Sequence, residues 1–270
     1  MKKTLITLMA LAGVAAAAET VTTTYEPLKE TGWTLASGRG AGTSNQAKQD
    51  IESGVVYTND PWWKQPYGTF AFADAISLEE KTDSISFSFT LNMDTITLTS
   101  SMLTVALEGN SGGSAATIVM GYGHNYSDTD NTNFKSAVVA DNSSDVYLFD
   151  TTWSDTVAGF TQYNCTSADL LGALSTSTSF TGSIAWDDAA SGYILTLAQG
   201  GESASYNLGS SYEMTGISIA LDGNSTNQKK DDLRVSDLSI TKTSLSVPEP
   251  TTATLSLLAL AGLAARRRRK

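Results

Sequence analysis

Apolar and polar side chains alternate over much of the chain between its two ends. Residues 84–91 read Ser-Ile-Ser-Phe-Ser-Phe-Thr-Leu, so that every second side chain is apolar. Successive side chains of a β-strand point to opposite faces, and this pattern therefore predicts a strand with one face in the core. Similar patterns predict further strands at residues 103–107, 117–122, 145–150, 180–186, 192–198, 203–208, 216–221 and 233–241.

Turn-forming sequences separate several of these strands. Gly109-Asn110-Ser111-Gly112-Gly113 and Asp187-Asp188-Ala189-Ala190-Ser191 each lie between two alternating segments, and both indicate hairpin turns. In the last segment the apolar positions shift from odd to even numbers after Val235, which predicts a bulge or kink in that strand. We expect helix only in two short connections, at residues 47–51 and 167–174.

Many short strands joined by turn-rich links predict an all-β fold, either an antiparallel sandwich or a barrel. The sequence shows no repeat of about 20–50 residues, which disfavours a solenoid or a propeller. Residues 216–223 alternate, a polar loop follows, and Asp231-Asp232 leads into the final strand at Leu233-Arg234-Val235. This ending resembles that of concanavalin-like, laminin-G-type jelly rolls, and the resemblance implies an antiparallel jelly-roll β-sandwich.

The C-terminal segment has a different composition. Val247-Pro248-Glu249-Pro250 is followed by an apolar run at 251–265 and by the basic end Arg266-Arg267-Arg268-Arg269-Lys270. The 19 residues at 247–265 fall within the roughly 17–25 that a helix needs to cross a bilayer. Its five leucines favour insertion by only about 1.5–3 kcal/mol, whereas moving five cations outward costs about 11 kcal/mol per 100 mV. We predict a marginal transmembrane helix whose basic tail stays in the cytoplasm.

This layout of motif, apolar span and basic end resembles the PEP-CTERM sorting signal of Gram-negative bacteria. The resemblance implies that an exosortase-type membrane protease recognises Pro248, Glu249 and Pro250. It also implies delivery to the cell surface or the extracellular matrix, often where exopolysaccharide is made. Proline lacks an amide donor and restricts the residue before it, so we expect an extended, accessible backbone around Glu249. An ordinary tail anchor is the alternative.

The N-terminus carries the features of a secretory signal peptide. Lys2 and Lys3 are followed by an apolar run at 5–14 and by four alanines at 15–18. We predict cleavage after Ala18 by signal peptidase, following export through the Sec translocon. The chain then consists of a signal peptide at 1–18, a β-sandwich domain at 19–246 and a sorting signal at 247–270. This organisation predicts a protein that is held briefly in the inner membrane and then displayed at the surface.

Charge limits the partners of the predicted domain. Of the 17 Lys and Arg residues, two lie in the leader and five in the tail, whereas of the 28 acidic residues only Glu249 lies outside 19–246. The domain therefore carries a net charge of about −17. This charge disfavours binding to nucleic acid or anionic lipid, because both need a basic surface. Cys165 is the only cysteine, so the chain has no internal disulfide. We expect its side chain to be a small buried hydrophobe.

Residues with catalytic spacing are missing from the sequence. Jelly rolls of this kind host laminarinase-type glycosidases with a Glu-x-Asp-x-x-Glu strand, but this chain contains no Glu-x-Asp. Asp50-Ile51-Glu52 and Asp128-Thr129-Asp130 are polar, loop-like pairs. Ser111 matches Gly-x-Ser-x-Gly, but a strand rather than a helix is expected to follow it, and His124 is the only histidine. We therefore predict no catalytic residues and a non-enzymatic protein, with a divergent glycoside hydrolase as the weaker alternative.

An aromatic cluster suggests a lectin-like alternative function. Trp62-Trp63-Lys64-Gln65-Pro66-Tyr67 follows Asn59-Asp60-Pro61, which places the rings on a turn or loop. Exposed aromatic rings beside amide and carboxylate groups suit stacking on sugars with hydrogen bonds to hydroxyls. Trp62, Trp63 and Tyr67 are therefore candidate carbohydrate-binding residues, possible contacts for an exopolysaccharide. The alternative is that they cap an open end of the core.

No cofactor is implied, although one segment has oxygen ligands at alternating positions. Asp128, Asp130 and Asn131 lie in Asp-Thr-Asp-Asn-Thr-Asn, a spacing typical of calcium loops. The segment departs from the EF-hand pattern, because Asn133 replaces the glycine and Val139 stands where the bidentate Glu belongs. Calcium binding here is an alternative to ordinary Asx turns.

Overall fold

The structure is a computed structural model that describes residues 19–37, 46–58, 66–93, 102–123, 133–140, 146–147, 164–165, 168–173, 177–222 and 233–246. The chain divides into two units. One is Thr22–Thr243, and the other joins Met1–Val21 with Ser244–Lys270. Within the described ranges, helix is limited to the single 3-10 turn η1 (Pro27–Lys29), and no helix is long and apolar enough to cross a membrane. The signal-peptide and transmembrane helices expected from the sequence lie outside these ranges.

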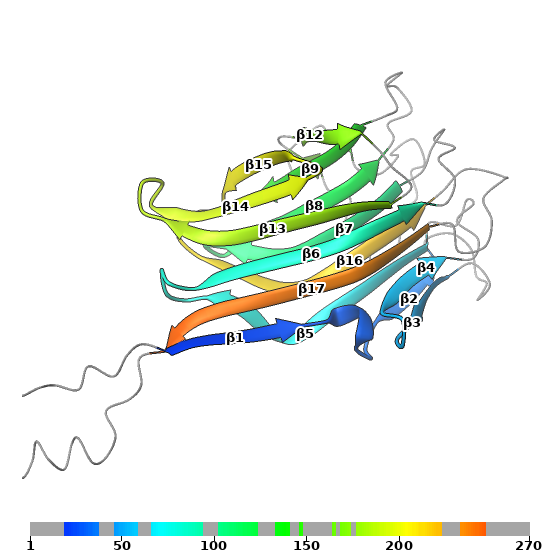
Figure 1. The fold of residues 1–270 in the computed structure, drawn as a ribbon, viewed down its shortest axis with the longest axis horizontal. Coiled ribbons are helices and arrows are strands. Elements are labelled where there is room, and N and C mark those ends of the chain that lie inside the picture. The colour runs from blue at the N-terminus through cyan, green and yellow to red at the C-terminus, as the bar shows by residue number, and fades with distance from the viewer. Residues whose placement is uncertain are drawn as a thin grey trace, which may run out of the picture. The chain divides into compact units, whose positions relative to one another are not determined.

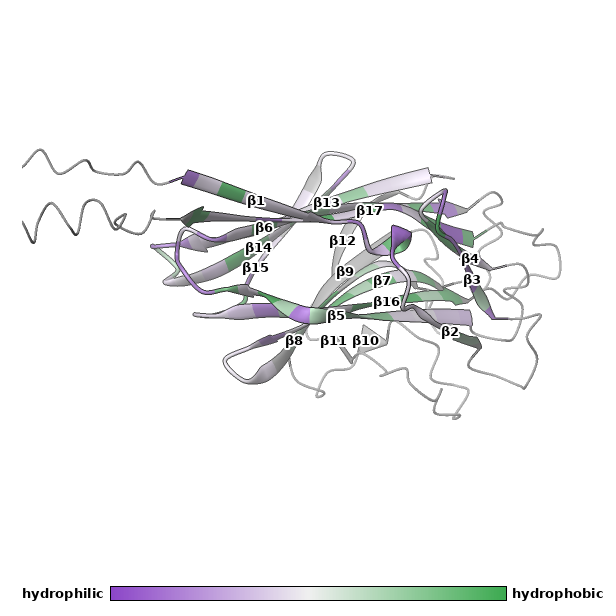
Figure 2. Ribbon diagram, turned by 90° about the horizontal axis from the view of Figure 1, so that it is seen from below, coloured by the Kyte–Doolittle hydropathy of each residue, from purple (hydrophilic) through white to green (hydrophobic). Residues whose placement is uncertain are grey.

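Two antiparallel sheets form the Thr22–Thr243 unit (Figures 1 and 2). The strands of the first sheet are β1 (Glu19–Tyr25), β3 (Ala47–Asp50), β4 (Val55–Thr58), β6 (Ser84–Met93), β13 (Ser177–Asp187), β14 (Gly192–Gln199), β15 (Glu202–Asn207) and β17 (Leu233–Ser246). Their order is β15-β14-β13-β6-β17-β4-β3, and β1 also pairs with β17.

The second sheet has the order β12-β9-β8-β7-β16-β5-β2. Its strands are β2 (Thr34–Ser37), β5 (Pro66–Leu78), β7 (Met102–Ser111), β8 (Ser114–Gly123), β9 (Asn133–Ala140), β12 (Ala168–Ala173) and β16 (Tyr212–Asp222). A separate two-stranded ladder pairs β10 (Val146–Tyr147) with β11 (Asn164–Cys165). The predicted all-β antiparallel sandwich is confirmed.

The core lies between the two sheets and follows the alternation of the sequence. On β6, Ile85, Phe87, Phe89 and Leu91 are all buried, while the residues between them form the outer face. Phe89 stacks on Phe180 of β13 with ring centroids 5.0 Å apart. Each such side chain contributes about 1.5–3 kcal/mol when it leaves water, so burial in this layer is the main term that holds the sheets together.

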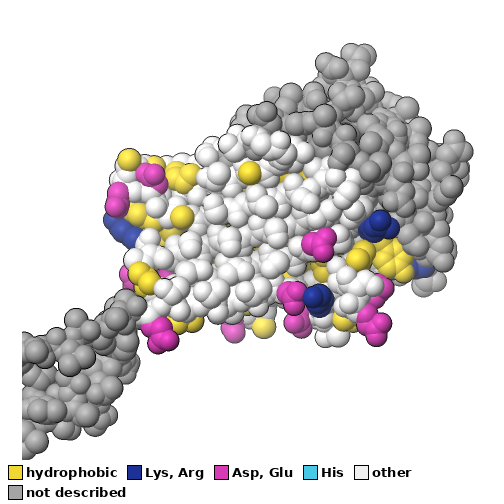
Figure 3. All heavy atoms as spheres, viewed as in Figure 1, with side chains coloured by type: hydrophobic (Ala, Val, Ile, Leu, Met, Phe, Trp, Pro, Cys, Tyr) yellow, Lys and Arg dark blue, Asp and Glu magenta, His cyan; other side chains and the backbone are white. Residues whose placement is uncertain are grey.

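The outer face of the first sheet is rich in hydroxyl groups. Thr90 and Ser179 are hydrogen-bonded across β6 and β13 at 3.2 Å, and Thr196 and Ser205 are bonded across β14 and β15 at 3.3 Å. Such cross-strand pairs suit a solvent-facing sheet. Charged side chains are sparse over the middle of the face seen in Figure 3, and acidic ones gather toward its ends and lower edge.

Both predicted hairpins and the predicted bulge are confirmed. β7 and β8 are joined by Gly112 and Gly113, whose φ angles of 56° and 83° suit a tight turn that matches the twist of the strands. Asp187 ends β13 and Gly192 begins β14. In β17 the register against β6 shifts between Ser236 and Ser239, and Asp237 there has a φ of 56°.

The two helical predictions are wrong. Residues 47–50 form β3, which pairs with β4 and buries Ala47, and residues 168–173 form β12, which pairs with β9. A helix this short gains too few hydrogen bonds to offset its nucleation, so pairing with a neighbouring strand wins. The predicted strand at 145–150 is limited to Val146–Tyr147 in the described part of the chain.

Candidate functional site

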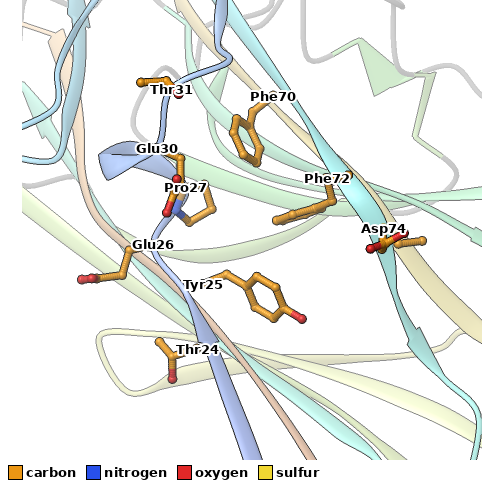
Figure 4. Close-up of a pocket in the computed structure, with 11 residues that line it drawn as sticks. Thr24, Tyr25, Glu26, Pro27, Glu30, Thr31, Phe70, Phe72 and Asp74 are labelled. Atoms are coloured by element: carbon orange, nitrogen blue, oxygen red, sulfur yellow. The ribbon is translucent and has the colours of Figure 1, made fainter.

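A pocket of about 490 Å³ opens between the β1–η1 segment and β5 (Figure 4). β1 belongs to the first sheet and β5 to the second, so the pocket lies at one open edge of the sandwich. Small-molecule sites commonly measure about 300–1,000 Å³, and this pocket is therefore large enough for a ligand. The side chains that matter chemically are Tyr25, Glu26, Glu30, Phe70, Phe72 and Asp74.

A bulge in β5 creates one wall of the pocket. Met214 of β16 pairs with Ile76 and Gly216 pairs with Ala71, so β5 advances five residues while β16 advances two. The three extra residues release the segment around Phe72 and Asp74 from the ladder. On its other side, β5 pairs with β2 only as far as Thr69. Bulges of this kind redirect side chains at the edge of a sheet and are frequent beside binding sites.

Aromatic rings from both walls converge on the pocket. Tyr25 points from β1 toward β5, whereas Phe70 and Phe72 point from β5 toward β1 (Figure 4). Phe72 contacts Tyr25 and Phe70 edge-to-face, with centroid separations of 5.7 Å and 5.5 Å. Trp33 extends the row, since its ring lies 5.5 Å from Phe70. All four rings are half-buried, so each is fixed by packing and still presents surface to solvent.

Hydrogen bonds fix the backbone that carries Tyr25 and the acidic residues. Trp33 donates from its indole Nε1 to the carbonyl oxygen of Pro27 at 2.7 Å. Gln49 of β3 donates from its amide nitrogen to the carbonyls of Leu28 and Glu30, at 2.8 Å each. Leu28 is 1% exposed and anchors η1 in the core. The η1 wall is therefore held in place before any ligand arrives.

Three carboxylates surround the rings. Glu26 points away from them in Figure 4 and forms a salt bridge of 2.7 Å with Lys29. Glu30 and Asp74 lie on opposite walls, and both are exposed. Neither carboxylate has a hydrogen-bond or ion-pair partner among the residues that the structure describes. The pocket therefore combines fixed apolar rings with acceptors that are open to a ligand.

A second aromatic cluster, the Trp186 corner, consists of Lys81, Trp186, Asp188 and Tyr193. Lys81 Nζ lies 4.4 Å from the centroid of the Trp186 ring and 3.6 Å from the Asp188 carboxylate. Trp186 donates to Asp188 at 2.8 Å and packs edge-to-face on Tyr193 at 5.3 Å. Every polar group of this corner thus has a partner within the corner or beside it.

The corner joins the turn between β5 and β6 to the rest of the first sheet. Tyr193 donates to the carbonyl oxygen of Glu80 at 2.9 Å. Asp83 is 5% exposed, and its Oδ2 accepts the backbone N–H groups of Glu79 and Glu80 at 3.0 Å and 3.2 Å. Burial raises the pKa of the Tyr193 hydroxyl, and the Asp83 and Glu80 carboxylates add to that rise.

Only one of the residues predicted to bind sugar lies in the described part of the chain. Tyr67 is the second residue of β5, so placing it on a loop was wrong, and its side chain is 8% exposed. Trp62 and Trp63 lie outside the described residues. So do the predicted calcium ligands Asp128, Asp130 and Asn131, and the sorting residues Pro248, Glu249, Pro250, Arg266, Arg267, Arg268, Arg269 and Lys270. Those assignments stay predictions.

Acidic pairs and the motif serine make structural contacts. Asp50 accepts hydrogen bonds from the Ser53 hydroxyl at 2.7 Å and the Ser53 amide at 3.1 Å, and these bonds lower its pKa. Asp187 accepts the amide of Ala190 at 2.8 Å across the β13–β14 turn. Ser111 donates to the carbonyl of Leu208. Among the described residues no group of three His, Cys, Asp or Glu side chains is arranged to hold a metal ion.

Sequence reasoning missed the pocket residues. In Phe70-Ala-Phe72-Ala-Asp74, large side chains alternate with small alanines, and this pattern could have indicated a strand. The pocket, however, brings together β1 and β5, which belong to different sheets and are about 45 residues apart in the sequence, and nothing in either segment specifies that they lie close together.

Comparison with known proteins identifies the C-terminal end. A family profile, the PEP-CTERM protein-sorting motif, matches residues 246–270. The chain carries this sorting motif. The PEP-CTERM resemblance inferred from the prolines, the apolar run and the basic tail is therefore confirmed. No curated protein matches the chain.

Several solved structures are similar to the PEP-CTERM-bearing chain. Peanut lectin with a 9mer peptide has a TM-score of 0.46 and 11% identity, covering 86% of this chain and 100% of the lectin. The Emp47p carbohydrate recognition domain has a TM-score of 0.47 and 10% identity, and the match covers 80% of this chain and 90% of that domain. The CBM2 module of Lactobacillus casei BL23 phage J-1 evolved Dit has a TM-score of 0.44 and 11% identity, covering 85% and 98%.

Proposed function

We propose that this chain is an exported, non-enzymatic carbohydrate-binding protein that its C-terminal signal holds at the cell surface or in the extracellular matrix. The sorting motif at residues 246–270 supports the export route and implies processing by an exosortase-type protease. The domain that this motif delivers begins with β1 and ends with β17, so the binding pocket travels with it.

The observation that carries the binding proposal is the pocket lined by Tyr25, Phe70 and Phe72. Aromatic rings stack on the apolar faces of sugars, and nearby carboxylates accept hydrogen bonds from hydroxyl groups. Glu30 and Asp74 supply such acceptors, one on each wall. The acidic residues elsewhere in the described domain, such as Asp50 and Asp83, accept hydrogen bonds within turns, which favours binding over hydrolysis.

Deleting residues 247–270 tests the sorting half of the proposal. Without the span and the basic end, nothing opposes complete translocation, and the domain is expected in the periplasm or the medium. Fractionation and immunoblotting of cells that produce the full or the shortened chain measure this. Unchanged surface retention of the shortened chain refutes the sorting role.

A panel of immobilised polysaccharides tests the binding half. We expect Phe72→Ala to weaken retention on the bound glycan about tenfold, because one stacking surface is lost. Trp186→Ala is the matched control, since it removes a half-buried ring outside the pocket. Equal retention of both variants contradicts the assignment of the pocket. Release of new sugar ends from any polysaccharide contradicts the non-enzymatic assignment and favours a divergent hydrolase.

A further inference from the structure

The pocket between β1 and β5 has a one-sided charge. Glu26, Glu30 and Asp74 line it, and no basic residue does so within the part of the chain that the structure describes. Lys29, the nearest cation on η1, is bonded to Glu26 at 2.7 Å. The domain as a whole carries about −17, so no distant surplus of positive charge offsets these carboxylates. The ligand of the pocket must therefore tolerate, or use, a negative environment.

We propose that the pocket binds sugar units that carry a free, protonated amino group, as in a deacetylated hexosamine polymer. The inference rests on the proposed carbohydrate-binding function and specifies its ligand class. Two features of the pocket recognise an ammonium group: faces of aromatic rings, and carboxylates without a protein partner.

The rings provide the first part of this recognition. A cation attracts the face of an aromatic ring within about 6 Å of its centroid, because the ring face is negative. Phe72 contacts both Tyr25 and Phe70 edge-to-face, and all three rings line the pocket and stay partly exposed, so they present aromatic surface to a ligand there. The same row offers an apolar surface to the sugar ring that carries the amine.

The carboxylates provide the second part. Glu30 lies on the η1 wall and Asp74 on the β5 wall, so a sugar chain in the pocket finds one carboxylate acceptor for its ammonium groups on each wall (Figure 4). Charge-assisted hydrogen bonds of this kind are about twice as strong as neutral ones. Glu26 contributes less, because it is engaged by Lys29 and points away from the rings.

The arrangement also rejects other glycans. A uronate or sulfated sugar would bring a negative charge beside Glu30 and Asp74, and like charges at close range oppose binding. An N-acetylated sugar keeps its ring and hydroxyls but loses the charge, so it retains the stacking contact and the hydroxyl hydrogen bonds without the charge-assisted bonds. The expected order of affinity is free amine first, N-acetyl second and acidic sugar last.

Isothermal titration calorimetry on the exported protein with three tetrasaccharides tests this order: glucosamine, N-acetylglucosamine and a uronate. We expect the glucosamine tetramer to bind at least about fivefold more tightly than its N-acetylated form, corresponding to about 1 kcal/mol. Asp74→Asn and Glu30→Gln should each remove about fivefold from the glucosamine affinity and leave the N-acetylated form unchanged. Asp188→Asn, an exposed carboxylate of the Trp186 corner, is the control and should change neither.

The outcomes separate this inference from the function on which it rests. Equal affinity for the free and acetylated tetramers, or tighter binding of the uronate, overturns the amino-sugar assignment and leaves carbohydrate binding intact. Binding of no glycan in the panel overturns both. Spermidine serves as a competitor without a sugar ring, and displacement of the tetramer at equal concentration overturns a glycan ligand in favour of a general amine site. Thermal melting of each variant confirms that it is folded.

Discussion

The pocket between β1 and β5 and the Trp186 corner both place aromatic rings beside carboxylates, but they differ in what those groups contact. In the corner, Lys81 covers the Trp186 ring and Asp188 accepts the indole N–H. In the pocket, the rings contact one another edge-to-face, and the carboxylates of Glu30 and Asp74 have no partner among the described residues.

The difference shows how similar compositions serve different purposes. Where each ring and carboxylate already has a partner, the cluster stabilises the fold and has little left to offer a ligand. Where the rings are fixed by packing and the acceptors are open, the same chemistry is available for binding. Substitutions in the Trp186 corner should therefore lower mainly the stability of the fold, whereas substitutions in the pocket should lower mainly the affinity for a ligand.

The largest effect is expected from Asp83→Ala, beside the Trp186 corner. Its buried carboxylate accepts two backbone N–H groups and lies 3.8 Å from Lys242 Nζ. Losing these charged acceptors leaves the two amides unpaired, and the free energy of unfolding should fall by about 3 kcal/mol. Urea denaturation measures this. Asp74→Ala in the pocket is the matched control, with a change below about 0.5 kcal/mol. If Asp83→Ala and Asp74→Ala both changed the free energy of unfolding only slightly, the corner would not stabilise the fold more than the pocket does.

The next effect concerns the rings themselves. Trp186→Ala removes the contact with Tyr193 and the hydrogen bond to Asp188, and should lower the free energy of unfolding by about 2 kcal/mol. Glycan affinity should not change. Phe72→Ala should cost a comparable amount of stability and also lower affinity. Denaturation and calorimetry on the same samples give both quantities. Loss of affinity in the Trp186 variant would show that the corner, too, takes part in binding.

Tyr193 makes the corner sensitive to alkaline pH. Its pKa is raised in the folded state, so the folded protein holds its proton more tightly than the unfolded chain, whose pKa is near 10.0. Stability from this group is complete below pH 10.0 and falls as the pH rises toward the folded pKa. Tyr193→Phe removes the hydrogen bond to Glu80, so the free energy of unfolding at pH 7 should fall by about 1 kcal/mol. The same variant should lose less stability at alkaline pH.

Tyr212 is the comparison for that variant. Burial raises its pKa and Glu108 adds to the rise, but its buried hydroxyl has no hydrogen-bond partner in the part of the chain that is described. Tyr212→Phe should therefore also lessen the alkaline decline, without a loss at pH 7. Denaturation midpoints from pH 7 to 11 measure both variants. A loss at pH 7 that is equal for the two would contradict the role of the Glu80 bond.

The smallest effect belongs to Lys81→Gln. The lysine and Asp188 side chains are 66% and 88% exposed, so their ion pair is strongly screened by solvent. Loss of the contact with the Trp186 ring should cost about 0.5 kcal/mol and should diminish in high salt. Denaturation at low and high salt measures it, and a loss that does not depend on salt indicates packing of the lysine stem instead.

Sequence reasoning predicted the parts of the fold that local patterns specify. The alternation of Ile85, Phe87, Phe89 and Leu91 was enough to place β6, and the shift of phase after Val235 located the bulge of β17. The turn glycines located the β7–β8 hairpin for the same reason, since the constraint lies within a few residues.

Features that depend on distant pairing were not predicted. Residues 47–50 and 168–173 have no strong alternation, and only their partners β4 and β9 make them strands. The pocket depends on the three extra residues of β5 opposite β16, which no local pattern reveals. The sequence predicted a binding loop at Trp62 and Trp63, just before β5, whereas the pocket is lined by Phe70 and Phe72, which lie within β5.

β17 lies between β6 and β4, and β1 joins it as well, yet it is the final strand before the sorting motif begins at residue 246. A polypeptide that crosses the inner membrane from its N-terminus keeps the middle of this sheet unfilled until nearly the whole chain has passed. On the proposed export route the sandwich is therefore completed only after translocation, and its precursor remains unfolded while it crosses the membrane. Because β17 ends at Ser246, where the sorting motif begins, the proposed route would complete the domain just as the sorting motif reaches the membrane.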